Sequence, residues 1–268
     1  YGIDWGNKTG TLRWNRLINP KTFSNTSVSY SNYNYKSQIF SGGSSSKTNS
    51  KITDWNLKHE FQYFPNTKNS IRIGYNSIYH NITPSNISDN NTIGRKKKNR
   101  YGWDNALYVN NTMEVTNNLS FDYGLRFSTY SIIGGDTYRI FEKSVLKDSI
   151  VLASGNIGKT YYNPEPRFQF NYTINEISSI KGGYARNIQH LHLLSTSTNS
   201  SPTDQWIGNS YNIKPETSDQ ISLGYFRNFN ENKYQCSIET YYKSLQNQVD
   251  YKDGVDLITS LDNESQLL

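Results

Sequence analysis

The chain has 268 residues, of which only 34% are hydrophobic, and its formal net charge at pH 7 is +6. No run approaches the roughly 18 apolar residues that a membrane helix needs, so any crossing of a membrane must be made by strands. The single Cys236 excludes an internal disulfide bond.

Apolar and polar residues alternate in a series of segments, which is the pattern of β-strands with one apolar and one polar face. These segments run to roughly 10 residues or more, the length of a tilted strand that crosses a bilayer, whereas strands in soluble sheets average about 5 to 6. In chain order the segments are centred near Leu12, Tyr30, Leu57, Ile73, Val109, Leu125, Phe170, Gly183, Leu223 and Ile238.

Short polar turns and long polar connections separate these segments in alternation. The short turns predict five hairpins, at 19–21, 65–69, 116–118, 175–176 and 230–232. The long connections are rich in Ser, Gly, Asn and Lys and cover 38–50, 84–100, 134–162 and 191–215, with a fifth beginning after Asp250. Strict alternation of this kind is typical of outer-membrane barrels. We therefore predict an all-β fold, an antiparallel up-and-down transmembrane β-barrel with roughly ten strands.

Aromatic residues gather near the predicted strand ends, at Trp55, Phe64, Tyr101, Trp103, Tyr130, Tyr161 and Tyr162. In a barrel they would form girdles at the level of the lipid headgroups. Ordinary surface aromatics are the alternative interpretation.

A basic run of Arg and Lys occupies 95–100, immediately before a predicted strand. A solvated loop is the favoured interpretation of such a run. The alternative is contact with lipopolysaccharide phosphates. Nucleic acid is not an expected partner, because no basic groove with spaced stacking aromatics accompanies the run.

The segment 119–127 shows the alternation without a break. Leu125 shares one face with the other apolar residues of the segment, and Asp122 and Arg126 share the opposite face. The apolar face should contact lipid and the polar face a wet lumen.

Residues 153–160 come close to a phosphate-binding loop and end in Lys159 and Thr160. Such a loop requires a following helix, which Pro164 and Pro166 exclude, and Ala153 stands where the strict pattern has glycine. Nucleotide binding is therefore not supported.

His190 and His192 would lie on one strand face, as a metal pair could, but no third ligand is close in sequence. A rim or loop position is the favoured interpretation. No nucleophile elbow, zinc-binding helix motif or calcium loop occurs. We expect no enzyme activity, no catalytic residue, no metal and no cofactor, although separate loops could still assemble Asp, His and Ser.

Several stretches resemble the barrel of TonB-dependent outer-membrane receptors of the Bacteroidetes type. The resemblance covers nearly the whole chain in order and is carried by 5–15, 163–168, 184–187 with 192–195, 200–206, 213–216, 220–225 and 247–253. It implies import of a siderophore, glycan, peptide or similar nutrient across the bacterial outer membrane, driven by an inner-membrane energy-coupling complex through a plug domain. Implied partners are outer-membrane lipid, lipopolysaccharide, the plug and a surface lipoprotein.

Barrels of this family have about 22 strands around a plugged lumen. Roughly ten strands therefore predict that 1–268 form a partial transmembrane barrel domain that lacks the plug and the remaining strands. Two other functions stay open. One is a passive or structural outer-membrane barrel without energised import, and the other is a soluble carbohydrate-binding module.

Candidate site residues follow from the same pattern. The predicted lumen-facing residues are Asp122, Arg126, Gln220, Glu239 and Lys243. His192, Asp204 and Trp206 are candidates for ligand contact in a loop, and packing of one loop against another is the favoured alternative for them.

Overall fold

The computed structural model describes residues 2–41, 44–89, 98–194, 205–252, 264 and 267. Within these residues, no helix is long and apolar enough to cross a bilayer. The strands are β1 (Gly2–Asn19), β2 (Thr22–Ser41), β3 (Ser44–Asn66), β4 (Asn69–Asp89), β5 (Arg100–Thr116), β6 (Leu119–Ile133), β7 (Asp136–Glu142), β8 (Val145–Leu152), β9 (Ile157–Asn175), β10 (Ser178–Gln189), β11 (Leu191–Leu194), β12 (Gln205–Gly208), β13 (Glu216–Phe229) and β14 (Tyr234–Gln246).

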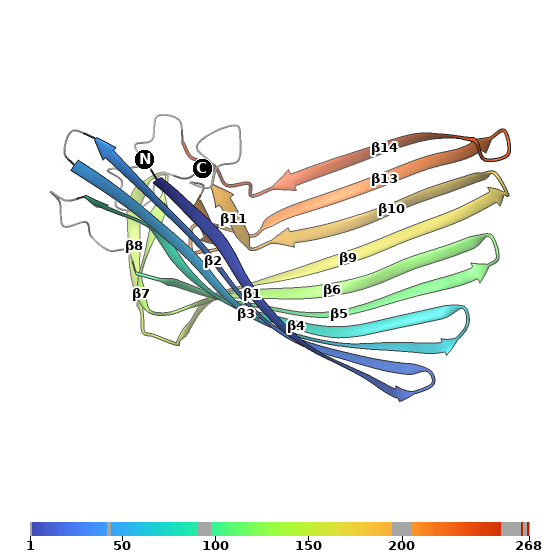
Figure 1. Cartoon of the computed structure of the whole chain (residues 1–268), viewed down its shortest axis with the longest axis horizontal. Coiled ribbons are helices and arrows are strands. Elements are labelled where there is room, and N and C mark those ends of the chain that lie inside the picture. The colour runs from blue at the N-terminus through green and yellow to red at the C-terminus, as the bar shows by residue number, and fades with distance from the viewer. Residues whose placement is uncertain are drawn as a thin grey trace.

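In the described part of the chain, ten strands form one antiparallel sheet in the order β1-β2-β3-β4-β5-β6-β9-β10-β13-β14. Consecutive strands of this sheet are neighbours, so the up-and-down topology is confirmed. The five short turns lie where the sequence predicts them and meet at one end of the sheet, on the right in Figure 1. The described parts of the long connections lie at the opposite end.

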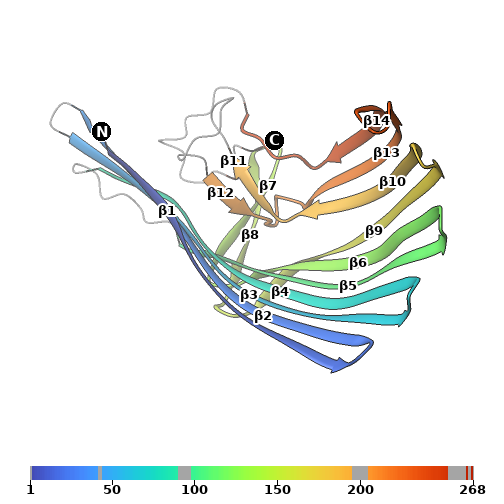
Figure 2. The ribbon, with the colours of Figure 1, turned by 45° about the vertical axis from the view of Figure 1, so that its right-hand side comes forward.

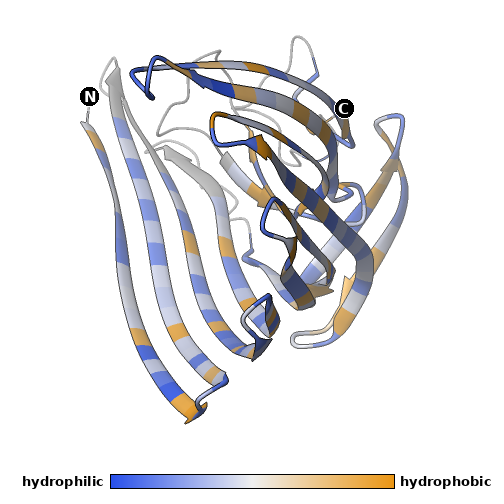
Figure 3. Cartoon of the chain, turned by 90° about the vertical axis from the view of Figure 1, so that its right-hand side faces the viewer, coloured by the Kyte–Doolittle hydropathy of each residue, from blue (hydrophilic) through white to orange (hydrophobic). Residues whose placement is uncertain are grey.

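Strand pairing places the alternating residues of each strand on two chemically different faces. Phe61, Ile73, Val109 and Leu125 are successive partners across β3, β4, β5 and β6, and all four are exposed. The residues between them are largely polar, which gives the banded colouring of the strands in Figure 3. The strand period of two therefore produces one apolar and one polar face, as the sequence predicts.

The sheet is curved, and the hairpins β7–β8 and β11–β12 lie on its concave side (Figure 2). Strand β12 contacts β4, and a Cβ atom on Gly208 would lie 3.3 Å from Ile82. Because Ile82 has the same strand parity as the polar-face residues, the polar face is the concave face and the apolar face is the convex face.

The long connections contain more regular structure than the sequence suggests. Strands β2 and β3 continue through most of 38–50, with Ser41 paired to Ser44, and the hairpins β7–β8 and β11–β12 lie inside two predicted loops. Backbone hydrogen bonds can pair strands that lack a regular apolar alternation. The sequence pattern therefore misses these extensions.

An aromatic row crosses the convex face towards the long-loop end. Tyr30, Trp55, Tyr79 and Trp103 are successive partners on β2 to β5, and the rings of Tyr30 and Trp55 lie 4.9 Å apart. This row has the place of a girdle.

Three of the predicted girdle residues have a different position. Phe64 packs edge to face on Phe23. The hydroxyl of Tyr161 donates a hydrogen bond to the Ser210 carbonyl. Tyr130 is buried beneath the β11–β12 hairpin. Nearness to a strand end is therefore not enough to place an aromatic ring in the girdle. The face of the strand also decides.

Candidate functional site

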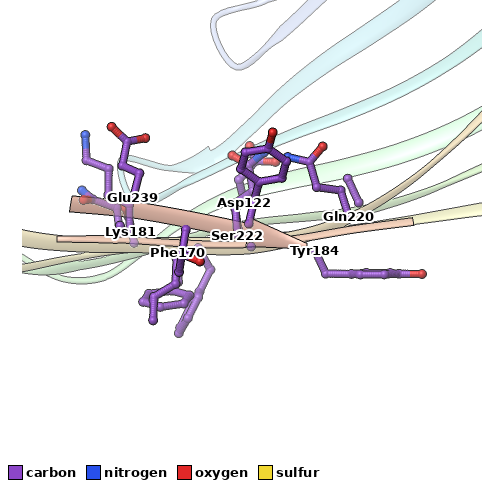
Figure 4. A pocket seen from close by; sticks show the side chains of 18 of the residues that line it. Asp122, Phe170, Lys181, Tyr184, Gln220, Ser222 and Glu239 are labelled. Atoms are coloured by element: carbon purple, nitrogen blue, oxygen red, sulfur yellow. The ribbon is translucent and has the colours of Figure 1, made fainter. Parts of the chain in front are cut away.

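A hollow of about 710 Å³ lies over strands β6, β9, β10, β13 and β14. Its floor contains the small residues Gly183, Ala185, Ser222 and Gly224, which leave space above the strands. In Figure 4, Asp122, Lys181, Gln220 and Glu239 rise from one side of the sheet. Phe170 points from the other side. The polar side chains of this hollow therefore belong to the concave face.

The predicted lumen-facing residues share this face. Asp122, Gln220 and Glu239 line the hollow, and Lys243 is the register partner of Gln220. Arg126 has the same parity on β6 as Asp122 and lies beside the hollow. The strand register thus places five residues from three strands, β6, β13 and β14, on the same face of the sheet.

The hollow contains a carboxylate held in place by hydrogen bonds, together with one positively and one negatively charged side chain on the two strands that flank β13. Asp122 accepts hydrogen bonds from Thr112 Oγ1 at 2.7 Å and from Asn110 Nδ2 at 3.2 Å, which fix its carboxylate. Lys181 and Glu239 are the two register partners of Gly224, on either side of it. Such a surface can hydrogen-bond a hydrated polar solute without a large net charge.

A second polar arrangement crosses five strands beside the hollow. Glu60, Gly74, Tyr108, Arg126 and Glu165 are successive register partners on β3, β4, β5, β6 and β9. Tyr108 donates to Glu60 Oε2 at 2.6 Å, and Arg126 Nε lies 3.3 Å from Glu165 Oε1. We call these five residues the polar ladder. The sequence does not reveal it, because the five residues meet only through the register.

Gly74 is the residue that allows the Tyr108 side chain to reach Glu60 across β4. A Cβ atom at Gly74 would lie 2.3 Å from both Cζ and Oη of Tyr108, so Gly74→Ala must displace the ring and break its bond to Glu60. We expect a loss of about 1 to 3 kcal/mol in the free energy of unfolding, measured by urea titration in detergent or liposomes.

Two controls separate the displaced ring from a general effect of the added methyl group. Gly10→Ala on β1 should be close to neutral, because no atom lies within 4 Å of its added Cβ. In a Tyr108→Ala background, Gly74→Ala should also lose its cost. An equal loss in the presence and absence of the Tyr108 ring would contradict the assignment.

The structure places two of the three candidate ligand-contact residues. His192 is buried, with Nε2 at 2.8 Å from Asn209 Oδ1, and Trp206 is half-buried as the register partner of Leu193. Asp204 lies outside the described residues. The buried position and hydrogen bond of His192 agree with loop packing.

The other sequence motifs occupy structural positions where they are described. Lys98 and Arg100 lie 3.6 and 3.4 Å from Asp136, and the rest of the basic run is outside the described residues. The stretch 153–160 forms a turn followed by β9, so no phosphate-binding helix follows it. Within the described residues, no group of three or more His, Cys, Asp or Glu side chains could hold a metal ion.

A smaller hollow of about 470 Å³ lies beside the tip of the β7–β8 hairpin. Its lining includes Lys143, Lys214 and Lys252 from three separate loops, together with Glu264, which accepts hydrogen bonds from Ser210 and Asn212. The lysines are too far apart in sequence for any motif to indicate this hollow.

The curved antiparallel sheet, with its apolar convex face and polar concave face, defines the wall of a large up-and-down β-barrel. Residues 1–265 match the family described as TonB dependent receptor-like, beta-barrel, and the chain belongs to this family. No curated protein sequence matches the chain.

Solved structures share the fold at low sequence identity. The copper transporter OprC superposes with a TM-score of 0.68 and 10% identity, covering 95% of this chain and 42% of that chain. The unliganded ferric citrate transporter FecA gives 0.58 and 10%, covering 90% of this chain and 35% of that chain. The ferric-catecholate import receptor Fiu from K12 E. coli gives 0.55 and 12%, with coverages of 94% and 42%. This chain therefore spans less than half the length of these proteins.

Proposed function

We propose that the chain forms part of the barrel of an outer-membrane receptor of the Bacteroidetes type, which imports a nutrient with energy from the inner membrane. The observation that carries the proposal is the curved sheet whose apolar convex face and polar concave face fit lipid and a wet lumen. Membership in the receptor family and the fold shared with a copper transporter and a ferric citrate transporter support it.

The proposed complete receptor has further strands and a plug. Within the described residues, β1 and β14 are the two edges of the ten-stranded sheet, and open edges are not tolerated in lipid. Further strands would close the barrel around a plug that contacts the energy-coupling complex. Outer-membrane lipid and lipopolysaccharide would surround the convex face, and a surface lipoprotein would meet the long loops.

We assign the concave face to the passage of the nutrient and to contact with the plug. Asp122, Gln220, Glu239 and Lys243 in and beside the hollow would present hydrogen-bonding and charged groups to a polar solute, with Arg126 next to them. Asp204 and Trp206 would contact the nutrient from the loop side, and the buried His192 would hold the loop in place through Asn209. A siderophore, a glycan or a peptide carries polar groups that such a surface can bind.

Uptake by cells that express the full-length receptor tests the proposal. We expect accumulation of a labelled nutrient from a panel of siderophores, oligosaccharides and peptides to fall to background when the inner-membrane coupling complex is deleted. Binding to the cell surface should persist in the deletion strain. Uptake that continues at the same rate without the complex would instead identify a passive or structural barrel.

A further inference from the structure

Three aromatic rings form a stack between the barrel wall and the β11–β12 hairpin. The ring of Tyr130 on β6 lies between His80 on β4, at 6.4 Å and an interplanar angle of 30°, and His190, at 5.1 Å and 25°. All three side chains are buried. The hairpin therefore meets the wall through His190, which immediately precedes β11.

Two glycines allow the Tyr130 side chain to occupy this place. A Cβ atom on Gly102 of β5 would lie 2.1 Å from Tyr130 Oη, and one on Gly208 of β12 would lie 2.4 Å from the same atom. Real Cβ atoms do not approach so closely, so the wall and the hairpin both need glycine at the contact. The hairpin is thus fitted to the wall at one defined position.

One amide side chain joins two histidines beside this stack. Asn209 Nδ2 lies 2.9 Å from His190 Nδ1, and Asn209 Oδ1 lies 2.8 Å from His192 Nε2. Because an amide NH₂ donates and its oxygen accepts, His190 Nδ1 must be the unprotonated acceptor and His192 Nε2 the donor. Rotating the amide reverses both roles. Asn209 can therefore accept a hydrogen bond from only one of these two nitrogens.

The surroundings of His190 disfavour a second proton on its ring. His190 is only 7% exposed, and its Nε2 has no hydrogen-bond partner within the described residues. The titratable or charged groups that face it are Tyr130 and Arg126 from β6, His80 from β4 and His192 from β11. Asp54 on β3 is bonded to His80 Nδ1 at 2.8 Å. Burial first, and then the electrostatic influence of His80, His192 and Arg126, lower the pKa of His190 to about 3.

We propose that the β11–β12 hairpin is an acid-released latch, docked on the inner wall through neutral His190 and freed when that ring takes up a proton. Protonation would put a positive charge on a buried ring whose Nε2 has no hydrogen-bond partner within the described residues. It would also place a cation beside Arg126 and His80. The latch is independent of whether import is energised.

The direction of the pH effect follows from the two states of His190. The pKa of His190 is lowered in the docked hairpin. In the released hairpin the pKa of His190 returns to the ordinary histidine value of about 6.5. Docking of the hairpin is therefore strongest above about pH 6.5 and weakens as the pH falls towards 3. In this range the equilibrium constant for opening rises by at most about tenfold per pH unit. Between pH 7.5 and pH 5.5 the equilibrium constant for opening of the hairpin should rise about tenfold in total.

Labelling of introduced cysteines in the full-length receptor measures this opening. Leu194 is 2% exposed and its neighbour Leu193 is 40% exposed, so Leu194→Cys reports release and Leu193→Cys corrects for thiol ionisation. Both are made in a Cys236→Ser background and treated with a membrane-impermeant maleimide. The expected result is a ratio of the two labelling rates that rises about tenfold from pH 7.5 to 5.5.

Variants of the contact test the chemistry of the latch. His190→Phe keeps a ring against Tyr130 but cannot titrate, so its ratio should not change with pH. Asn209→Asp offers a carboxylate that accepts from both histidines, so release should move to lower pH. His59→Gln is the control: His59 bonds to Thr26 on β2, away from the hairpin, and this variant should respond like the wild type.

Three results would overturn the proposal. The first is a constant wild-type ratio between pH 7.5 and 5.5, and the second is an unchanged acid response in His190→Phe. If His190→Phe fails to dock and labels rapidly at every pH, Asn209→Asp decides, and acid release at the wild-type pH in that variant is the third.

Discussion

Leu125→Arg should reduce the free energy of unfolding of the full-length barrel by about 2 to 4 kcal/mol. Leu125 is 47% exposed on the convex face and lies midway along β6 between Leu119 at the turn and Ser131, the partner of Trp103 in the aromatic row. This position corresponds to the bilayer midplane, where an arginine on the lipid face is most costly.

Reversible folding into liposomes, followed by denaturant titration, measures this loss. Gln169→Arg is the matched control, because Gln169 is exposed on the concave face of the neighbouring strand β9. We expect less than about 0.5 kcal/mol for the control. Equal costs for the two arginines would contradict the assignment of the convex face to lipid.

The second large effect concerns the Arg126–Glu165 pair of the polar ladder. Glu165 is 4% exposed, and Arg126→Met removes the closer of its two cations, because Arg167 lies 3.8 Å from it. A buried carboxylate left with only the more distant Arg167 is costly, and we expect a loss of about 3 kcal/mol in the free energy of unfolding.

A double-mutant cycle distinguishes the unpaired charge from lost packing. The double variant Arg126→Met/Glu165→Met leaves no buried charge at the pair, so it should recover most of the stability lost in Arg126→Met. Losses that simply add in the double variant would show that the two side chains act independently. Both measurements use the same liposome titration.

The strands and short turns could be predicted from the sequence because the residue patterns that indicate them are local. In 119–127, lipid on one side of the strand and water on the other select apolar and polar residues in alternation. This alternation can be recognised without knowing which strands pair with the segment. Likewise, Pro20 and the asparagines of the turns restrict the backbone locally. These signals correctly predicted the ten strands that make up the sheet in the described residues.

The loop hairpins could not be predicted from the sequence, because contacts with residues distant in the sequence stabilise them. In β7–β8, the Phe141 amide donates to Asn212 Oδ1 at 2.9 Å, and Asn212 Nδ2 donates to the Arg139 carbonyl. Tyr130 illustrates the same limit. Its strand parity assigns it to the polar face, but only the folded hairpin shows that Tyr130 is covered at the loop end of this face.

Local sequence patterns were enough to predict the all-β class, the ten strands of the main sheet, the short turns and the two chemically different faces. Each of these depends on the contacts of a residue with solvent or with its immediate neighbours. Only the tertiary structure decided which residues meet across strands. Glu60, Tyr108 and Arg126 meet through strand register. His190 and Asn209 meet through the folding of a loop onto the wall. Register and loop docking are long-range contacts, and no local residue pattern encodes them.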